Sequence, residues 1–285
     1  MSAAPAASYS PAGPAVASQR HRVGFGHYML AEWTKIRSVR STFWTLIVAI
    51  VVVVGFTALI TWVTAANWNG PRAAPRDARA IADPTAIIFG VAIYLGQLAI
   101  AVLGVLVVTT EYSTGVIRAS LLAVPRRITM LAAKVTVFTL VMFVLAEILA
   151  FGSFFVGAAI LHSHVSVSLS DTGVLRATFG AGLYLVTFGL FAMAIGVLLR
   201  HTAGAISIAV AVAFVLPILA GLLPDTSLWN HLVGYLPVQA GSQVITVHPT
   251  GDAIVLSAWE GYGVLCIWVA VLFGFGAYLF SRRDA

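Results

Sequence analysis

A single carboxylate lies deep inside one of the long apolar runs of this sequence. Glu147 stands in FVLAEILAF, well beyond Lys134, and a helix would separate the two by about 20 Å at 1.5 Å per residue. An ionisable group at that depth in a membrane is costly and by default indicates a functional site. The alternative is a carboxyl that is protonated, or hydrogen-bonded to a Ser, Thr or Tyr of a neighbouring helix, and only holds the helices together. Both interpretations stay open.

Two polar side chains and a proline interrupt other apolar runs. Tyr94 and Gln97 are three residues apart, so in a helix they share a face and can line a passage. A glutamine in such a segment can equally bond to a neighbouring helix, which contributes about 1 kcal/mol or less. Pro217, in FVLPILAG, removes a backbone donor and predicts a bend. Such bends serve gating in some bundles and only shape in others.

The sequence lacks the motifs of an enzyme. A phosphate-binding loop needs a glycine-rich turn that ends in Gly-Lys, but Lys35 follows Thr34 and Lys134 follows Ala133. No HExxH helix, GxSxG turn or Cys/His metal spacing is present. His162 and His164, in LHSHVS, are interpreted as polar loop residues. We therefore expect no catalytic, cofactor-binding or metal site in this chain, and if ATP drives it, another chain hydrolyses the nucleotide.

The composition identifies a membrane protein. The 285 residues are 60% hydrophobic and 9% charged, whereas about 25% of an ordinary soluble domain is charged. The net charge of +6 does not predict a nucleic-acid partner, because the basic residues are scattered between apolar runs. The single cysteine, Cys266, can form no internal disulfide. We expect a tail over residues 1–24, disordered and cytoplasmic, and one membrane domain over residues 25–285.

Six apolar runs are long enough to cross a bilayer core of about 30 Å as helices. They show no apolar/polar alternation, which excludes the pattern of a membrane barrel. The fold class is therefore all-α, a polytopic bundle of six transmembrane helices. The expected spans are residues 43–65, 84–109, 130–161, 174–199, 202–223 and 258–280.

Basic residues predict the orientation, since they concentrate in cytoplasmic segments. With six spans both termini lie on one side, and that side receives all but four of the 16 Lys and Arg residues. Both termini and residues 111–127 are thus expected in the cytoplasm. Just before the first span, Phe25, Met29 and Trp33 share an arc of a helical wheel, which predicts an interfacial helix along the lipid bilayer. Glu32 and Arg40 lie close to that arc and make the apolar face imperfect, so a basic anchoring segment without a fixed helix stays an alternative.

A charged stretch, EYSTGVIRASLLAVPRR, separates the second and third apolar runs. Ser113, Thr114 and Gly115 offer turn or cap chemistry, and Pro125 disfavours helix before it. The intervening residues are enough for a short helix across the cytoplasmic face, with Leu121 and Leu122 free to meet lipid or a protein groove. A connecting loop held by phosphate headgroups explains the same residues equally well.

The stretch resembles the first cytoplasmic loop of type-2 exporter permeases of the ATP-binding-cassette family, especially their actinobacterial branch. The matching pattern is Glu-Tyr-x-x-Gly, then Ile-Arg-x-x-Leu and Pro-Arg-Arg, with Val116 in place of the usual threonine. The segments AEWTKIRSVRSTFW, RHTAGAISIAV and GYLPVQAGSQVI are also similar to that family, so the resemblance covers most of the chain from about residue 28.

The resemblance implies a permease of the bacterial plasma membrane that docks a coupling helix on a separate ATPase. Two permeases, here expected as a homodimer, and two ATPase subunits would form the complex, and the partner would bind ATP and Mg. The cargo would be an amphipathic or hydrophobic small molecule such as a drug, antibiotic or lipid. The implied coupling residues, with Leu122 added as the neighbour of Leu121, are Glu111, Gly115, Ile117, Arg118, Leu121, Leu122, Pro125 and Arg126.

A function from another class fits the same sequence. The chain can be a membrane sensor or scaffold that associates with an ATPase-like partner and transports nothing. The substrate and the direction of transport are not encoded in any motif, because direction comes from family analogy alone.

Overall fold

The computed structural model describes residues 24–38, 40–69, 78, 80–115, 127–222, 226–248 and 256–282. Within these ranges the chain is helical with no strand, as predicted. The expected tail over residues 1–24 lies almost wholly outside them. The elements, in chain order, are α1 (Phe25–Ser38), α2 (Arg40–Ala66), α4 (Pro84–Ser113), α6 (Arg127–Leu161), α7 (Val174–Leu199), α8 (Thr202–Val210), the π-helical turn η1 (Ala211–Val215), α9 (Leu216–Leu222), α10 (Ser227–Gly234), α11 (Pro237–Ser242) and α12 (Ala258–Arg282).

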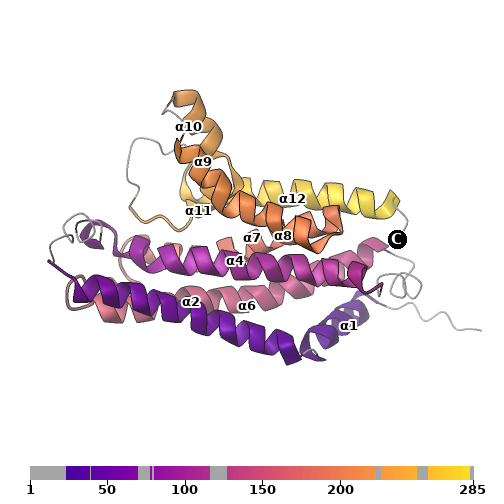
Figure 1. Cartoon of the computed structure of the whole chain (residues 1–285), viewed down its shortest axis with the longest axis horizontal. Helices are drawn as coiled ribbons and strands as arrows, with labels where there is room; N and C mark the ends of the chain where they lie inside the picture. The colour runs from indigo at the N-terminus through magenta and orange to yellow at the C-terminus, as the bar shows by residue number, and fades with distance from the viewer. Residues whose placement is uncertain are drawn as a thin grey trace, which may run out of the picture.

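Six segments of the described chain are long and apolar enough to cross a membrane, and they match the six predicted spans. Their bounds are Phe43–Ala66, Pro84–Ser113, Ile128–Leu161, Val174–Leu199, Thr202–Leu222 and Ala258–Leu279. Four of the elements that carry them, α2, α4, α6 and α12, run lengthwise through the molecule (Figure 1). The second span extends one turn beyond its predicted end at residue 109, so Glu111 lies inside a helix rather than after one.

The fourth span, α7, is the most buried of the six and packs against α4, α6 and α12. Small residues allow this central position. Gly182, Gly189 and Gly196 recur every seventh residue along α7, and a Cβ on Gly104 of α4 would collide with the carbonyl oxygen of Gly189. In lipid, helices associate largely through such close packing, because water no longer drives apolar surfaces together.

The fifth span is distorted where Pro217 predicts it. α8 and α9 are joined by the π-helical turn η1, and the amide of Leu216 bonds to the carbonyl of Ala211. Pro217 has no N–H and its ring crowds the carbonyl four residues earlier, so a wider turn directly before it relieves the clash. π-Turns inside α-helices are often found at functional sites, and this one faces a cavity described below.

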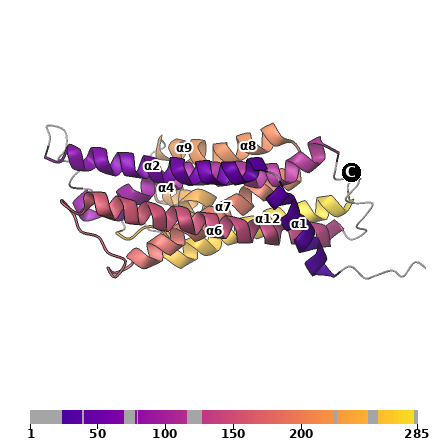
Figure 2. The same ribbon diagram turned by 90° about the horizontal axis from the view of Figure 1, so that it is seen from below.

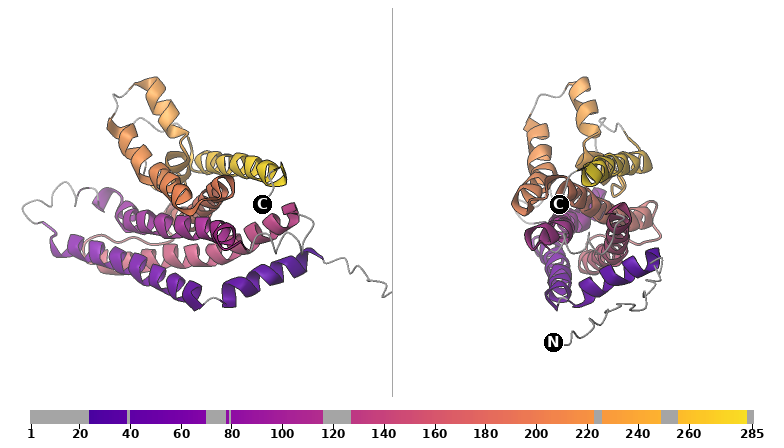
Figure 3. Two further views of the ribbon diagram at one scale, coloured as in Figure 1. Left: turned by 45° about the vertical axis from the view of Figure 1, so that its right-hand side comes forward. Right: turned by 90° about the vertical axis from the view of Figure 1, so that its right-hand side faces the viewer.

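The two ends of the bundle differ. At one end, which we call the Asp83 end, Asp83 caps α4, and the short helices α10 and α11 lie between the fifth and sixth spans. The indole of Trp229 on α10 donates to the carbonyl of Ala220. At the opposite, Glu111 end, α1 crosses α6 at a steep angle (Figure 2). Further views place α10 and α12 on the side of the bundle away from α1 (Figure 3).

The close approach of α4 and α7 gives a first prediction. Gly104→Ala should lower the thermal stability of the detergent-solubilised protein, because the added methyl group meets the backbone of α7 and overpacking typically costs about 1–3 kcal/mol. Gly90→Ala is the matched control on the same helix. A Cβ at Gly90 meets nothing within 4 Å, and alanine favours helix by about 1 kcal/mol. Equal melting temperatures for the two variants would contradict the packing described.

Candidate functional site

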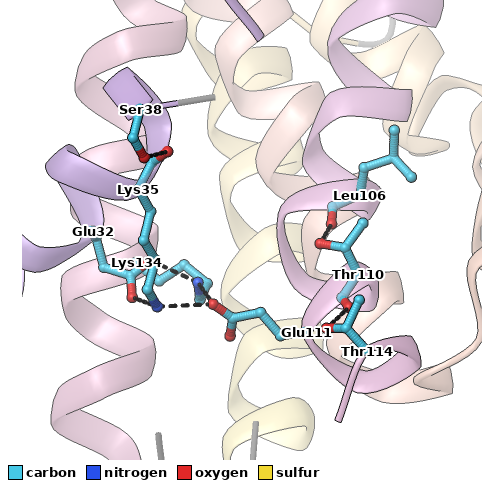
Figure 4. A network of polar contacts seen from close by, with 8 residues as sticks. All are labelled: Glu32, Lys35, Ser38, Leu106, Thr110, Glu111, Thr114 and Lys134. Atoms are coloured by element: carbon cyan, nitrogen blue, oxygen red, sulfur yellow. Dashed lines mark hydrogen bonds and ion pairs between the residues drawn. The ribbon is translucent and has the colours of Figure 1, made fainter. Parts of the chain in front are cut away.

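Four charged side chains from three helices meet at the Glu111 end, and we call them the ion-pair cluster. Lys134 Nζ of α6 lies 2.7 Å from Glu32 Oε2 of α1 and 2.8 Å from Glu111 Oε1 of α4. Lys35 Nζ of α1 lies 2.6 Å from Glu32 Oε1 and 3.0 Å from Glu111 Oε1. All four point toward one another (Figure 4). Each lysine therefore bridges both carboxylates, and the cluster joins α1, α4 and α6.

The cluster is buried and electrically balanced. Lys134 is 4% exposed, Glu32 7% and Glu111 9%, while Lys35 reaches solvent. Two negative charges face two positive ones, so the cluster as a whole is neutral. Removing one partner of such a set typically costs about 3–5 kcal/mol, since an uncompensated buried charge remains. The chain has no lysine other than these two.

The cluster explains why the apolar face of α1 is imperfect. Glu32, which lies close to that face in the sequence pattern, is the buried residue of α1 and points at α6. α1 thus combines an apolar arc with one acidic contact to a fixed partner. The sequence singled out Glu111 as a coupling residue, which stays a prediction, but did not indicate Glu32, Lys35 and Lys134 as its partners. Lys134, which lies inside the apolar run after Arg127, was the available signal in the sequence, because a lysine in such a run needs a charged partner.

The neighbouring charges shift the pKa of the two groups on α1. Burial alone would raise the pKa of Glu32, but the Lys134 and Lys35 ammonium groups outweigh it and hold this pKa below its usual 4.5. Burial would likewise lower the pKa of Lys35, yet its bonds to Glu32 and Glu111 raise it above 10.5. Glu32 and Lys35 are consequently both ionised across the neutral range.

α4 ends in a way that assigns structural roles to the residues after Glu111. The hydroxyls of Ser113 and Thr114 both donate back to the carbonyl of Thr110, at 3.1 and 2.7 Å. Gly115 follows with φ of 71°, the left-handed conformation that commonly closes a helix at a glycine. Ser113 and Thr114 therefore finish α4 in the described structure. The other predicted coupling residues lie outside the described residues: Ile117, Arg118, Leu121, Leu122, Pro125 and Arg126.

A short turn between α7 and α8 packs beside the cluster at the same end. Arg200, with φ of 56°, places its guanidinium 5.2 Å from the centre of the Tyr112 ring. Thr202 donates to Thr109 of α4 at 2.9 Å. These contacts tie the start of the fifth span to the last turns of α4. A movement of the end of α4 would therefore displace both α1 and α8.

The Asp83 end contains a cavity of about 830 Å³, the Gln97 cavity, enclosed by α4, α7, η1, α9 and the segment around α11. It brings together Tyr94, Gln97 and Pro217, three polar or kink residues that the sequence singled out. Tyr184 of α7, which the sequence did not single out, donates its hydroxyl proton to Gln97 Oε1 at 2.8 Å. Gln97 Nε2 is buried and has no hydrogen-bond partner within the described chain.

Glu147 lies apart from both features, on α6 against α7. A Cβ on Gly182 would collide with the Glu147 carboxylate, so the glycine provides the space that the carboxylate fills. Both carboxylate oxygens are buried without a hydrogen-bond partner among the described residues. The alternative of a bond to a neighbouring Ser, Thr or Tyr is therefore wrong for this part of the chain. A protonated packing group and a functional group stay as predictions.

His164 has a local role, as its interpretation as a polar loop residue suggests. Its Nδ1 lies 2.8 Å from Ser163 Oγ, and its ring packs against Trp68 with the ring centres 4.7 Å apart. These contacts join the loop after α6 to the end of α2.

The fold and these sites define the class of the protein as a multi-pass, all-α membrane protein. Comparison with protein-family models and with curated proteins returned no match.

The cluster gives a second prediction. Lys134→Met should lower the melting temperature of the solubilised protein strongly, because two buried carboxylates would then share only Lys35, a loss of about 3–5 kcal/mol. Adding Glu32→Gln restores charge balance and should recover much of that loss. Arg37→Met, which removes an exposed cation from α1, is the control and should change little. A Lys134→Met protein as stable as the Arg37→Met protein would refute the cluster.

The pKa shifts give a third prediction. Because the folded-state pKa of Glu32 is lowered, its stabilisation is complete above pH 4.5 and is lost as the pH falls through the folded value. Because that of Lys35 is raised, its stabilisation is complete below pH 10.5 and is lost as the pH rises through the folded value. The melting temperature should therefore be flat near neutrality and fall at both extremes. Glu32→Gln should flatten the acid limb, and an unchanged acid limb would contradict this origin.

Proposed function

We propose that this chain is the membrane-spanning permease subunit of an ATP-driven exporter of the ATP-binding-cassette type. It would move an amphipathic or hydrophobic small molecule across the bacterial plasma membrane. A separate ATPase subunit, in two copies, would bind ATP and Mg and dock on residues 116–126. The observation that carries the proposal is the ion-pair cluster. It joins the end of α4, the helix before residues 116–126, to the start of α6, the helix after them.

The position of the cluster supports a mechanical role. Glu111 is in the last turn of α4 and Lys134 is in the first turns of α6, so the segment between them is anchored at both ends by one ion pair. Glu32 connects the same lysine to α1. A force that reaches the end of α4 and the start of α6 would therefore act on three helices together.

The use of the lysines supports a partner chain as the site of ATP hydrolysis. A P-loop lysine contacts the phosphates of a nucleotide, but Lys35 and Lys134 both bind carboxylates in the cluster. The permease is therefore proposed to receive work from ATP without binding it. In a homodimer, two such clusters would each face one ATPase subunit.

The Gln97 cavity supports a transport role because it lies at the end of the bundle opposite the proposed docking segment. Asp83, which lines the cavity, and Glu111 are at opposite ends of α4, roughly 40 Å apart by helical rise. Motion at the docking end would reach the cavity through α4, which packs along α7, and through α8, which continues into η1 and Pro217. This route relates the kinked fifth span to the coupling residues.

The docking role gives a fourth prediction. Tagged protein purified from its native membranes in mild detergent should carry an ATPase subunit and hydrolyse Mg-ATP, and Leu121→Asp with Leu122→Asp should release that subunit. The matched control is Leu228→Asp with Leu232→Asp, two exposed leucines of α10 at the opposite end, which should retain it. Retention by the first variant, or equal loss from both, would contradict the docking assignment.

Reconstitution separates the exporter from the sensor or scaffold. An exporter and its ATPase in liposomes should show ATP hydrolysis that a transported compound stimulates, together with movement of that compound to one side. A scaffold would show neither, and a screen of candidate amphipathic compounds for stimulated hydrolysis is the direct way to find the cargo.

A further inference from the structure

We propose that the Gln97 cavity is a binding site for an uncharged amphipathic molecule, and that Gln97 Nε2 donates a hydrogen bond to a carbonyl or similar acceptor oxygen of that molecule. The binding is a property of this chain alone. Only the view that the bound molecule is the cargo rests on the proposed function.

The side-chain amide of Gln97 carries an unused hydrogen-bond donor. Gln97 is 1% exposed, and its Nε2 has no hydrogen-bond partner within the described chain. Buried polar groups in native proteins almost always have a partner, and each exception calls for an explanation. Gln97 lines the cavity, so an occupant that displaces the side chains covering Nε2 and carries an acceptor oxygen would supply the missing bond.

The amide is held in a fixed orientation. The hydroxyl of Tyr184, a residue with no exposed surface, donates to Gln97 Oε1 at 2.8 Å, so the oxygen is occupied and the NH₂ group remains for a ligand. The Tyr184 ring is itself confined by α11, because a Cβ on Gly241 would lie 3.0 Å from two of its ring carbons. A donor fixed in this way loses little conformational entropy on binding.

The remaining walls fit the apolar body of such a molecule. Phe89, Ile93 and Val238 line the cavity together with Tyr94, whose ring lies 6.0 Å from that of Phe214. Its volume of about 830 Å³ is within the usual range of small-molecule sites, which are mostly apolar with a few placed polar groups.

The charges at the cavity favour an uncharged occupant. No Lys or Arg is among the described residues that line it, and His248 is the one basic side chain among them, so an anionic group would find no permanently charged partner there. The one carboxylate, Asp83, accepts bonds from the Thr85 hydroxyl and the Ala86 amide at the positive end of the α4 dipole. Its charge is thereby engaged in capping the helix.

Benzophenone, an uncharged aromatic ketone, is a direct probe, because irradiation links it to nearby C–H groups. The purified chain, without any ATPase, would be irradiated with benzophenone and its adducts mapped by mass spectrometry. Adducts are expected on the cavity walls from α4, α9 and α11. Fluorenone, which keeps the carbonyl, should suppress them at about a tenfold lower concentration than fluorene, which lacks it, the difference expected for one hydrogen bond.

Gln97→Leu should abolish that tenfold difference and Tyr184→Phe should reduce it. A second hollow of about 920 Å³, between α1, α2 and α6 and lined by apolar residues such as Leu30, Ile47 and Val144, is the internal control. Its labelling should be the same in all variants and equally sensitive to both competitors. If Gln97→Leu loses this control labelling through misfolding, the Tyr184→Phe protein decides the matter.

Four results would overturn the proposal: no adducts in the cavity, equal potency of fluorene and fluorenone, a preference for fluorenone that survives both substitutions, or suppression by phosphatidylcholine as strong as that by fluorenone. The last result would assign the cavity to a membrane phospholipid instead of an uncharged solute. Because no ATP is present, failure here leaves the docking and transport experiments unaffected.

Discussion

The burial of Glu32, Glu111 and Lys134 where α1, α4 and α6 meet, with Lys35 at the solvent edge, is the constraint on which the Glu111 end depends. Charges removed from water must be paired with good geometry, and Lys134 achieves this only when Glu32 and Glu111 arrive from two other helices. The interfacial helix therefore has one defined position on the bundle, although its apolar arc alone would let it slide. The end of α4 and the start of α6 are fixed by the same lysine.

Close packing carries this constraint along the molecule. The glycines of α7 bring its backbone against α4 and α6, so these helices cannot shift independently of one another. Near the Asp83 end the same α7 supplies Tyr184, which orients Gln97. The fifth span, distorted at η1 and joined to α4 by Thr202 and Thr109, provides a second route between the two ends. The ion-pair cluster at one end and the Gln97 cavity at the other are thus parts of one packed unit.

Apolar run length predicted the spans well because a helix in lipid must satisfy its own backbone, and the span over residues 174–199 is α7 to the residue. Pro217 predicted the distorted turn because proline has no backbone N–H. The partners of Glu111 were not predictable in the same way, since Glu32 and Lys134 are distant in the chain and pairing requires the three-dimensional arrangement. The same holds for Tyr184 and Gln97: the glutamine was noticeable within its apolar run, whereas a tyrosine in α7 carried no comparable signal.

We propose that work done on residues 116–126 reaches the Gln97 cavity through the ion-pair cluster, and thiol labelling inside the cavity would detect that coupling. In a Cys266→Ala background, Tyr94→Cys places one thiol at an exposed position that lines the cavity, and its reaction rate with a maleimide is measured in the reconstituted complex. Mg-ATP should change this rate, and Lys134→Met with Glu32→Gln should remove the change while the ATPase stays bound. A rate that responds to ATP equally well without the cluster would exclude the cluster as the route between the two ends.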